Sequence, residues 1–327
     1  MRHNKDMDED ALINVIKDVV GATPGSHLGI GDDAAAVFVK GPTLIAHDVA
    51  VEDVHFRWRT HSPADVGHSV FAANLSDIAA MGGHPTAAVI GLAAPAEILS
   101  STFIRSLYTG MHELAFPLGC AIIGGDISTA RTTMIGVTII GHMDPPDLAP
   151  ITRSTARLGD VIAITGTVGG SLAGRTLLEH PEYERSAYAH DLIRRHLRPM
   201  ARSVEGPRFA RQGAHAMLDV SDGVLRDTAR MAQASGVGIE IELSAIPISP
   251  GTAEIAQACG SLPDLFAATG GGDYELLIAG PPALFHIPEC AATPIGRVIA
   301  GPPGLRVVRD GQIVEITHLG WDHLNTN

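Results

Sequence analysis

The sequence predicts a mixed α/β (α+β) protein of two domains, and three observations favour this class. The chain has 327 residues, of which 45% are hydrophobic, which is enough for two ordinary cores. Segments of helical and of strand periodicity mix in both halves, with the β-rich runs clustered early. Residues 143–150, Met-Asp-Pro-Pro-Asp-Leu-Ala-Pro, have turn composition and no periodicity. We therefore predict an N-terminal domain over residues 1–147 and a C-terminal domain over residues 148–327.

The first half alternates between helical and strand patterns. Its clearest element is a long helix from Pro63 to Met81, which Gly82 and Gly83 should end. Asn74 and Asp77 are three residues apart, so they should project from one side of that helix. The predicted elements in order are helix 8–20, strands 34–39 and 43–47, helix 63–81, strand 86–92, helix 101–118, and strands 120–123 and 134–141.

The second half continues this alternation with more turns. A strand should lead through a glycine-rich turn into a helix that begins near Ser171. Residues 175–211 are largely helical in pattern, broken at Pro181 and Pro199. The predicted strands are 161–165, 216–220, 238–242, 274–279, 294–299 and 305–308, with a further helix over 224–235.

Composition argues against several classes of partner. The chain carries 23 Lys and Arg against 36 Asp and Glu, a net charge of −13, which repels nucleic acid and anionic membranes. Lysine occurs only at Lys5, Lys17 and Lys40, so arginine must supply any later cationic contact with phosphate. No apolar run approaches the ~20 residues of a membrane span. We expect no nucleic-acid or membrane partner and a cytoplasmic location, in keeping with three scattered cysteines.

Eight aspartates stand at abrupt breaks between apolar stretches, most of them beside glycine. They are Asp32, Asp33, Asp48, Asp77, Asp126, Asp219, Asp222 and Asp273. A folded core cannot hold so many carboxylates close together unless cations neutralise them. Hard oxygen ligands suit Mg²⁺, and Mg²⁺ in enzymes commonly accompanies phosphate. The pattern therefore predicts metal-dependent chemistry on a phosphorylated substrate.

Some of these aspartates also have a structural interpretation. Asp33 and Asp126 both follow glycines and could lie in simple turns. Gly125 could instead let the phosphates of a nucleotide approach the backbone. Asp77 is harder to explain structurally, because aspartate is a poor mid-helix residue and its neighbours are small and apolar. For Asp77 we favour metal binding.

The segment around Ser221 closes a strand and opens a helix. Ser221 or Asp222 could be an N-cap, but capping does not explain Asp219, which alternates with Ser221 on one strand face. Residues 165–171 resemble a phosphate loop in composition, but no Gly-Lys-Ser/Thr follows, so a tight strand–helix connection is the favoured role. Arg153, just after the predicted domain boundary, is a candidate phosphate contact.

Taken together and in order, six motifs resemble those of the thiamine-monophosphate kinase family, which belongs to the superfamily of aminoimidazole-ribonucleotide synthetase. The resemblance extends from Gly29 to about Trp321. The motifs are Gly-Ile-Gly-Asp-Asp (29–33), Asn-Leu-Ser-Asp-Ile-Ala-Ala-Met-Gly (74–82), Ile-Gly-Gly-Asp (123–126), Arg-His-Leu-Arg-Pro (195–199), Asp-Val-Ser-Asp-Gly (219–223) and Gly-Asp-Tyr-Glu-Leu-Leu (272–277).

The resemblance implies two aminoimidazole-ribonucleotide synthetase-like domains and a homodimer formed through the N-terminal ones. It implies that ATP transfers its γ-phosphoryl group to the phosphate of thiamine monophosphate, with several Mg²⁺ ions, to give thiamine diphosphate and ADP. The acceptor is already an ionised phosphate, so no general base is needed. The main task is then to neutralise and align two anions.

Motif matching also implies a role for individual residues. The implied metal ligands are Asp33, Asp48, Asp77, Asp126, Asp219 and Asp222, of which Asp77, Asp126 and Asp222 are the predicted catalytic residues. The implied ATP contacts are Tyr108, Gly125, Asp126, Arg153 and Ser221. His55 and Trp321 would contact the thiamine substrate, Trp321 as an aromatic surface for a heterocycle.

The chain departs from the family pattern at three matched positions. Ala46 and His47 stand where the family has Ser and Thr, and Gly272 stands where it has Glu. His47 could ligate a metal, although imidazole is softer than Mg²⁺ prefers. These changes keep two alternatives open: a degenerate relative that binds nucleotide without phosphoryl transfer, and another ATP-dependent enzyme of the same superfamily.

Overall fold

The computed structural model describes residues 9–21, 26–30, 34–39, 41–183 and 186–321. Contacts between Cα atoms divide the chain into two compact units. The first unit comprises residues 1–78 and 84–147, and the second unit comprises residues 79–83 and 148–327. The stretch 79–83 thus groups with the second unit, whereas the predicted division assigned it to the N-terminal domain. Both units combine helices with a sheet, so the predicted mixed α/β class is confirmed.

The described residues of the first unit form a four-stranded sheet with the order β3-β6-β4-β5. Its strands are β3 (Thr43–Val51), β4 (His84–Ala94), β5 (Ala121–Thr129) and β6 (Met134–His142). β4 and β5 are parallel, and the other neighbours are antiparallel. A parallel pair needs a crossover connection, which α3 (Ser101–Ala115) supplies. A separate short ribbon pairs β1 (Ser26–Leu28) with β2 (Ala36–Val37).

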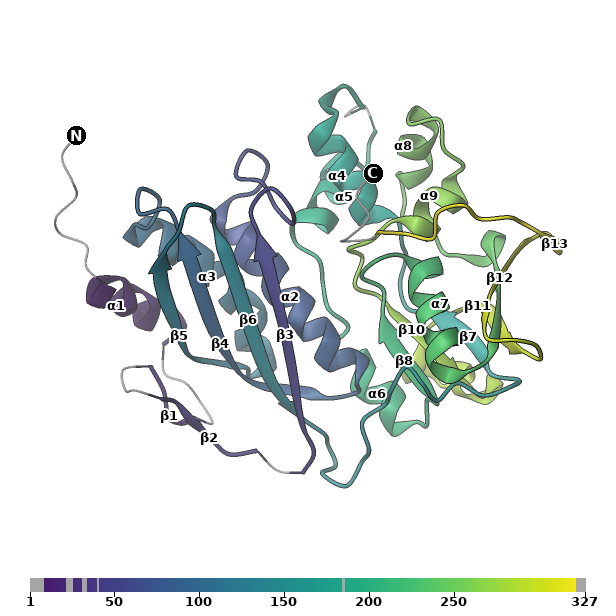
Figure 1. Ribbon diagram of the computed structural model, residues 1–327, viewed down its shortest axis with the longest axis horizontal. Coiled ribbons are helices and arrows are strands. Elements are labelled where there is room, and N and C mark those ends of the chain that lie inside the picture. The colour runs from purple at the N-terminus through teal and green to yellow at the C-terminus, as the bar shows by residue number, and fades with distance from the viewer. Residues whose placement is uncertain (1–8, 22–25, 31–33, 40, 184–185, 322–327) are drawn as a thin grey trace. The chain divides into compact units, whose positions relative to one another are not determined.

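Helices cover one face of this sheet. Figure 1 shows α2 (Pro63–Ala80) and α3 behind the strands, and α1 (Glu9–Val20) packs against α3. Along β3, Ala46 and Ala50 are buried, whereas Ile45 is 70% exposed and Val49 40% exposed. Because side chains alternate along a strand, the exposed apolar residues lie on the face away from the helices. The first unit therefore has one packed face and one open apolar face.

The second unit contains a mixed sheet of seven strands among the described residues, in the order β13-β12-β9-β11-β7-β10-β8. β12 and β9 are parallel, and the remaining neighbours are antiparallel. The strands are β7 (Val161–Ile164), β8 (Ala216–Asp219), β9 (Gly238–Glu242), β10 (Leu276–Gly280), β11 (Thr293–Ile299), β12 (Gly304–Arg309) and β13 (Gln312–Ile313). The neighbouring interior strands β7 and β10 are almost wholly buried, as expected for strands covered on both faces.

Helices of the second unit pack on this sheet and on each other. α7 follows β8 directly and contacts β9, β10 and β12. The α-helices are α4 (Gly170–Glu179), α5 (Ala189–Leu197), α6 (Glu205–Arg211), α7 (Val224–Ser235), α8 (Thr252–Ala258) and α9 (Pro263–Thr269). Short 3₁₀ turns are η1 (Phe116–Leu118) in the first unit and η2 (Pro181–Tyr183), η3 (Leu243–Ala245), η4 (Pro282–His286) and η5 (Pro288–Cys290) in the second.

Most predicted elements are confirmed, and the differences have simple causes. β5 runs on through Gly124, Gly125 and Asp126 to Thr129, although glycine is a weak strand former and the sequence suggested a turn there. α8 and α9 were not predicted, because seven residues give too few helical repeats to recognise. Within the described ranges, no helix is both long enough and apolar enough to cross a membrane.

Candidate functional site

In the first unit, Asp48 on β3 is linked to the helix that carries Asp77. Asp48 shares the helix-covered face with the buried Ala46 and Ala50, yet it is exposed there. Its backbone N–H donates to Oδ1 of Asn74 at 3.1 Å. Asp77 follows Asn74 by three residues and so lies on the same side of α2. The fold therefore brings these two predicted metal ligands to the same edge of the sheet.

His47 points the other way. Adjacent residues of a strand face opposite sides of the sheet, and Nδ1 of His47 lies 2.8 Å from Oγ1 of Thr138 on β6. The imidazole is thus on the open face, while Asp48 is on the helix-covered face. The idea that His47 could ligate a metal together with Asp48 of its own chain is therefore not supported.

Gly125 and Asp126 are exposed residues in the middle of β5. A Cβ at position 125 would lie 2.0 Å from the backbone oxygen of Ile90, so the close approach of β4 by itself requires glycine there. The carboxylate of Asp126 accepts a hydrogen bond from the Ser128 hydroxyl at 2.9 Å. β5 and β3 are the two edge strands, so Asp126 and Asp48 lie at opposite edges of one sheet.

The other predicted residues of the first unit occupy different environments. Asp33, like Asp32, lies outside the described residues. Tyr108 is in the core of α3, 2% exposed, and burial raises its pKa. His55 is exposed in the turn after β3, where its Nδ1 accepts from the Val51 N–H at 3.1 Å. Of these described positions, His55 is open to a ligand within this unit and Tyr108 is not.

In the second unit, Asp219, Ser221 and Asp222 sit in a turn at the end of β8. The turn is not loose, because backbone hydrogen bonds pair it with the loop before β10. Val220 N donates to Glu275 O at 2.8 Å, and the N–H of Gly272 donates to Ser221 O at 2.8 Å. Ser221 is half-buried and Asp222 is buried. The Asp-Val-Ser-Asp-Gly motif is thus a fixed turn that opens α7.

A buried carboxylate and an arginine of α7 complete this turn. Asp227 Oδ2 accepts from the Asp222 N–H at 3.0 Å, and Arg230 reaches Asp222 at 2.6 Å and Asp227 at 2.7 Å. Burial raises the pKa of Asp227 to about 7, and the nearby carboxylates of Asp219 and Asp222 add to this rise. The carboxylates of the turn therefore repel one another even with Arg230 in place.

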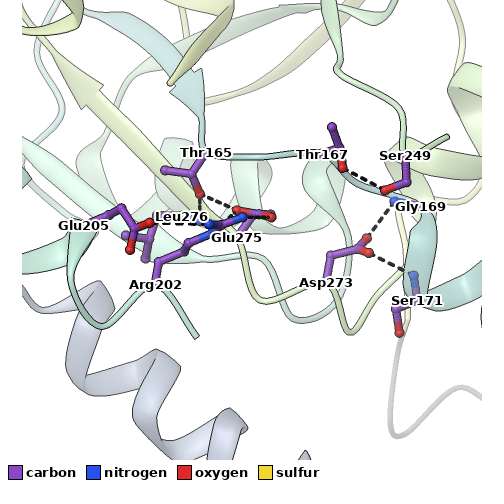
Figure 2. Close-up of polar contacts among 10 residues, drawn as sticks. All are labelled: Thr165, Thr167, Gly169, Ser171, Arg202, Glu205, Ser249, Asp273, Glu275 and Leu276. Carbon is purple, nitrogen blue, oxygen red and sulfur yellow. Dashed lines mark hydrogen bonds and ion pairs between the residues drawn. The ribbon is translucent and has the colours of Figure 1, made fainter. Parts of the chain in front are cut away.

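Asp273 holds the glycine-rich loop between β7 and α4 (Figure 2). Its two carboxylate oxygens accept from the N–H of Gly169 at 2.7 Å and of Ser171 at 2.9 Å. These amides open α4, where a helix favours negative charge. The place that a phosphate would take in a phosphate loop is thus filled by Asp273. The favoured sequence interpretation, a strand–helix connection, is supported.

Glu275 forms a second structural network beside the first (Figure 2). Its side chain is 4% exposed and binds Arg202 through two contacts, of 2.5 and 2.6 Å. The hydroxyl of Thr165 donates to the same carboxylate at 2.6 Å. Arg202 also lies 3.4 Å from Glu205 at the start of α6. The Asp-Tyr-Glu motif of this loop is therefore a pair of structural anchors around Tyr274.

Trp321 is attached to the Ser-Asp-Gly turn by its backbone. Its N–H donates to Asp222 O at 2.9 Å, and a Cβ on Gly320 would lie 2.2 Å from that same oxygen, so glycine permits the close approach. The guanidinium of Arg175 on α4 lies 5.9 Å from the Trp321 ring centre, within cation–π range. Arg153 is exposed on the segment that leads into the second unit.

Gly272 adopts a left-handed backbone conformation, with φ of +83°. A Cβ there would lie 2.7 Å from Oγ of Ser171, which in turn lies 3.2 Å from Nδ1 of His196. A glutamate at this position would be strained, at a cost of roughly 1–3 kcal/mol. The backbone conformation of this loop therefore favours glycine over the family's glutamate at position 272.

The described residues do not gather the predicted metal ligands into one cluster. No three His, Cys, Asp or Glu side chains among them are arranged so that they could hold an ion by themselves. In the first unit, Asn74 links the backbone of Asp48 to the helix that carries Asp77, and in the second unit Asp219 and Asp222 share a turn. Asp126 lies apart on β5.

Sequence reasoning missed two residues of the second unit that contact predicted site residues. Asp227 binds the backbone of Asp222, and Arg230 binds its carboxylate. A signal was present, since Asp227 and Arg230 are three residues apart on a predicted helix and so form an ion pair of the usual helical spacing. The contact from Arg230 back to Asp222 depends on how α7 leaves the turn, which spacing does not reveal.

Two family models match the chain. AIR synthase related protein, N-terminal domain, matches residues 31–143, and AIR synthase related protein, C-terminal domain, matches residues 157–307. Thiamine-monophosphate kinase of Mycobacterium tuberculosis is 39% identical over 299 residues, which cover 90% of this chain and 85% of that protein.

Solved structures agree with these matches. The crystal structure of thiamine-monophosphate kinase from Stenotrophomonas maltophilia is similar with a TM-score of 0.81 and 31% identity, over 94% of this chain and 98% of that chain. The structure of AaThiL complexed with AMPPCP and TMP has a TM-score of 0.77 and 33% identity, over 99% of both chains.

Proposed function

The chain belongs to the thiamine-monophosphate kinase family, and on this premise we propose that its acidic side chains hold Mg²⁺ ions between ATP and thiamine monophosphate during phosphoryl transfer. As a member, it is an ATP-dependent phosphotransferase that makes thiamine diphosphate. The observation that carries the metal proposal is the turn after β8, where Asp219, Ser221 and Asp222 are fixed beside a carboxylate whose pKa is raised to about 7.

The reaction needs little covalent chemistry from the protein. An oxygen of the thiamine monophosphate phosphate attacks the γ-phosphorus of ATP, the bond from that phosphorus to the bridging oxygen breaks, and ADP leaves. Because the attacking phosphate is already ionised, no side chain has to remove a proton. Catalysis then rests on bringing two polyanions together in line.

The chemistry of the donors fits divalent cations, although no three of the described side chains form an ion-binding cluster by themselves. Asp48, Asp77 and Asp126 offer carboxylate oxygens in the first unit, and Asp219 and Asp222 offer them in the second; Asp33 completes the proposed set. Burial is the main cause of the raised pKa of Asp227, and the carboxylates of Asp219 and Asp222 add to it, so acidic side chains are close together in this turn. Mg²⁺, when bound, would neutralise phosphate charge and support the transfer. Asp77, Asp126 and Asp222 are the proposed catalytic members.

The nucleotide contacts that we propose differ in their support. Ser221 is half-buried at a strand end, Arg153 is exposed, and Gly125 and Asp126 are exposed on β5, so all four are open to a ligand. Tyr108 has the weakest support, because its side chain is buried in α3.

For the thiamine moiety we propose Trp321 and His55. The backbone hydrogen bond from Trp321 to Asp222 supports this role, since it keeps an aromatic residue attached to the acidic turn. His55 is exposed near the end of β3, the strand that carries Asp48.

We also propose that the protein is a homodimer formed through the first unit. The open face of its sheet carries exposed apolar side chains, including Ile45 at 70% and Met134 at 43% exposure. An exposed apolar patch on a sheet is typical of an interface. Analytical ultracentrifugation tests this, with a dimer expected. The cytoplasmic location remains a prediction.

The direct test of function is incubation of the purified protein with ATP, MgCl₂ and thiamine monophosphate, followed by chromatography of the products. We expect thiamine diphosphate and ADP in equal amounts, and neither when EDTA replaces MgCl₂. Folded protein that gives no thiamine diphosphate at any Mg²⁺ concentration would contradict the proposal.

A second candidate function is nucleotide binding without transfer. The left-handed Gly272 favours it, because this loop cannot present a glutamate without strain. Calorimetry distinguishes the two: tight ATP binding together with no turnover on any thiamine phosphate would support the second candidate. An inactive Gly272→Glu variant would not distinguish the two candidates, since backbone strain at position 272, and not a missing contact, could keep it inactive.

A further inference from the structure

The second unit contains an open pocket of about 730 Å³, in which Arg153, already proposed as a nucleotide contact, lies beside further basic residues. Three of its seven lining residues are arginines. The lining residues are Arg153, Arg226, Ala229, Arg230, Gln233, Ala234 and Leu319, and we call this the arginine pocket. In a chain with a net charge of −13, such a concentration of positive charge in one hollow is unusual.

The pocket is built from one face of α7 and a fixed stretch before β7. Arg226, Arg230 and Gln233 are spaced four and three residues apart, so their side chains stack along one side of the helix. Arg153 is held opposite them by its backbone, because its carbonyl accepts from the Ser235 hydroxyl at 3.0 Å. Arg153 and α7 are therefore attached to each other within one unit.

The charges of the pocket are not neutralised evenly. Arg230 binds Asp222 and Asp227, which fixes its guanidinium. No ion pair joins the Arg153 side chain to another residue in the part of the chain that the structure describes. Arg153 is exposed, so its guanidinium can bind an anion in the pocket that Arg226 and Arg230 also line.

We propose that Arg226 and Arg230 join Arg153 to form a phosphate-binding subsite for the nucleotide. The proposal rests on the proposed function, which makes ATP a substrate. The pocket adjoins the Ser-Asp-Gly turn through the contact of Arg230 with Asp222. A guanidinium group can donate two parallel hydrogen bonds to the oxygens of one phosphate, and Gln233 adds an amide donor. Lysine is absent after Lys40, so arginine has to provide such contacts.

Arg226→Gln is the critical variant, because Arg230 also stabilises buried Asp227 and its loss could unfold the protein. Steady-state kinetics should show a KM for ATP raised roughly tenfold to a hundredfold, the usual effect of losing a charge-assisted hydrogen bond. The KM for thiamine monophosphate should stay within about twofold. Calorimetry with ATP and MgCl₂ should show the same loss of affinity, and Arg226→Lys should recover part of it.

The matched control is Arg297→Gln, which removes an exposed arginine of the same unit that pairs with Glu240. It should leave both KM values unchanged. Thermal unfolding of Arg226→Gln should match that of the unchanged protein. A merely structural role for Arg226 would instead lower the unfolding temperature and disturb both KM values together.

Two results would overturn the subsite. One is unchanged ATP affinity in Arg226→Gln, and the other is a rise in the KM for thiamine monophosphate alone, which would assign the pocket to the other phosphate. If the unchanged protein binds ATP without turnover and Arg226→Gln weakens that binding, the subsite stands while the proposed kinase mechanism fails.

Discussion

Two regions of this molecule share one sequence signature and use it in different ways. Gly124-Gly125-Asp126 and Gly271-Gly272-Asp273 both place an aspartate after two glycines, following an apolar segment. Asp126 is exposed on β5 and accepts a hydrogen bond from one neighbouring hydroxyl. Asp273 accepts hydrogen bonds from two backbone amides that lie more than 100 residues away in the chain.

The difference between the two aspartates lies in what surrounds the carboxylate. Asp273 has its negative charge satisfied by the amides at the start of α4, so it holds a loop in place. Asp126 is exposed and accepts from one neighbouring hydroxyl, which is compatible with its proposed role as a metal ligand. Glycine before aspartate thus does not identify a structural carboxylate; the hydrogen-bond donors around the carboxylate do.

The largest expected effect concerns the structural side of this comparison. Arg202→Ala should lower the free energy of unfolding by about 3–5 kcal/mol, because it leaves the charge of Glu275 buried without its partner. Urea unfolding followed by circular dichroism measures this. The control, Arg297→Ala, breaks an exposed pair and should cost no more than about 1 kcal/mol. Equal losses of unfolding free energy in the two variants would contradict a structural role for the pair of Arg202 and Glu275.

Asp126→Asn tests the functional side. We expect kcat to fall by about 10²–10³, or roughly 3–4 kcal/mol in the barrier, because a proposed metal ligand loses its charge. The unfolding transition should not move, since Asp126 is exposed. Asp147→Asn, an exposed acid of the same unit, should have neither effect. Retained activity in Asp126→Asn would remove this residue from the site.

Asp273→Ala should show the opposite pattern to Asp126. Removing the carboxylate leaves the N–H groups of Gly169 and Ser171 without their acceptor, at a cost of about 2–3 kcal/mol in the free energy of unfolding. Asp126→Ala, measured in the same urea titration, should lose no stability. If the two aspartates prove equally unimportant for stability, the contrast drawn above is wrong.

The smallest expected effect is a pH dependence. Burial raises the pKa of Asp273 to about 7, against the opposing effect of its two amide donors, whereas an unfolded aspartate titrates near 4. The folded state therefore keeps a proton that the unfolded state releases, and this stabilisation is full below about pH 4 and is lost as the pH rises through 7.

Relative to Asp273→Asn, the unchanged protein should lose roughly 1–2 kcal/mol of stability between pH 6 and pH 8. Urea titrations of both proteins at several pH values measure the difference in their free energies of unfolding. Groups that titrate alike in both proteins do not contribute to this difference. A difference that does not change with pH would show that Asp273 stays ionised throughout.

Local patterns predicted much of the fold because they depend on short-range geometry. The helix over 224–235 and the strand over 238–242 have their predicted bounds, since Gly223 and Gly236 flank a segment of regular apolar spacing. The path of β5 was not predictable in this way. There the pairing with β4 holds two glycines in a strand that their own preferences disfavour.

The sequence by itself determined the family, the mixed α/β class and the residue types available for binding phosphate and metal, because ordered motifs and periodicity are properties of neighbouring residues. Only the tertiary structure decided which acidic side chains already have hydrogen-bond or ion-pair partners within the protein. Packing of the chain brings Arg230 to Asp222 and the amides of α4 to Asp273. The strength of an ionic contact depends on distance and burial, and the order of the residues alone gives neither.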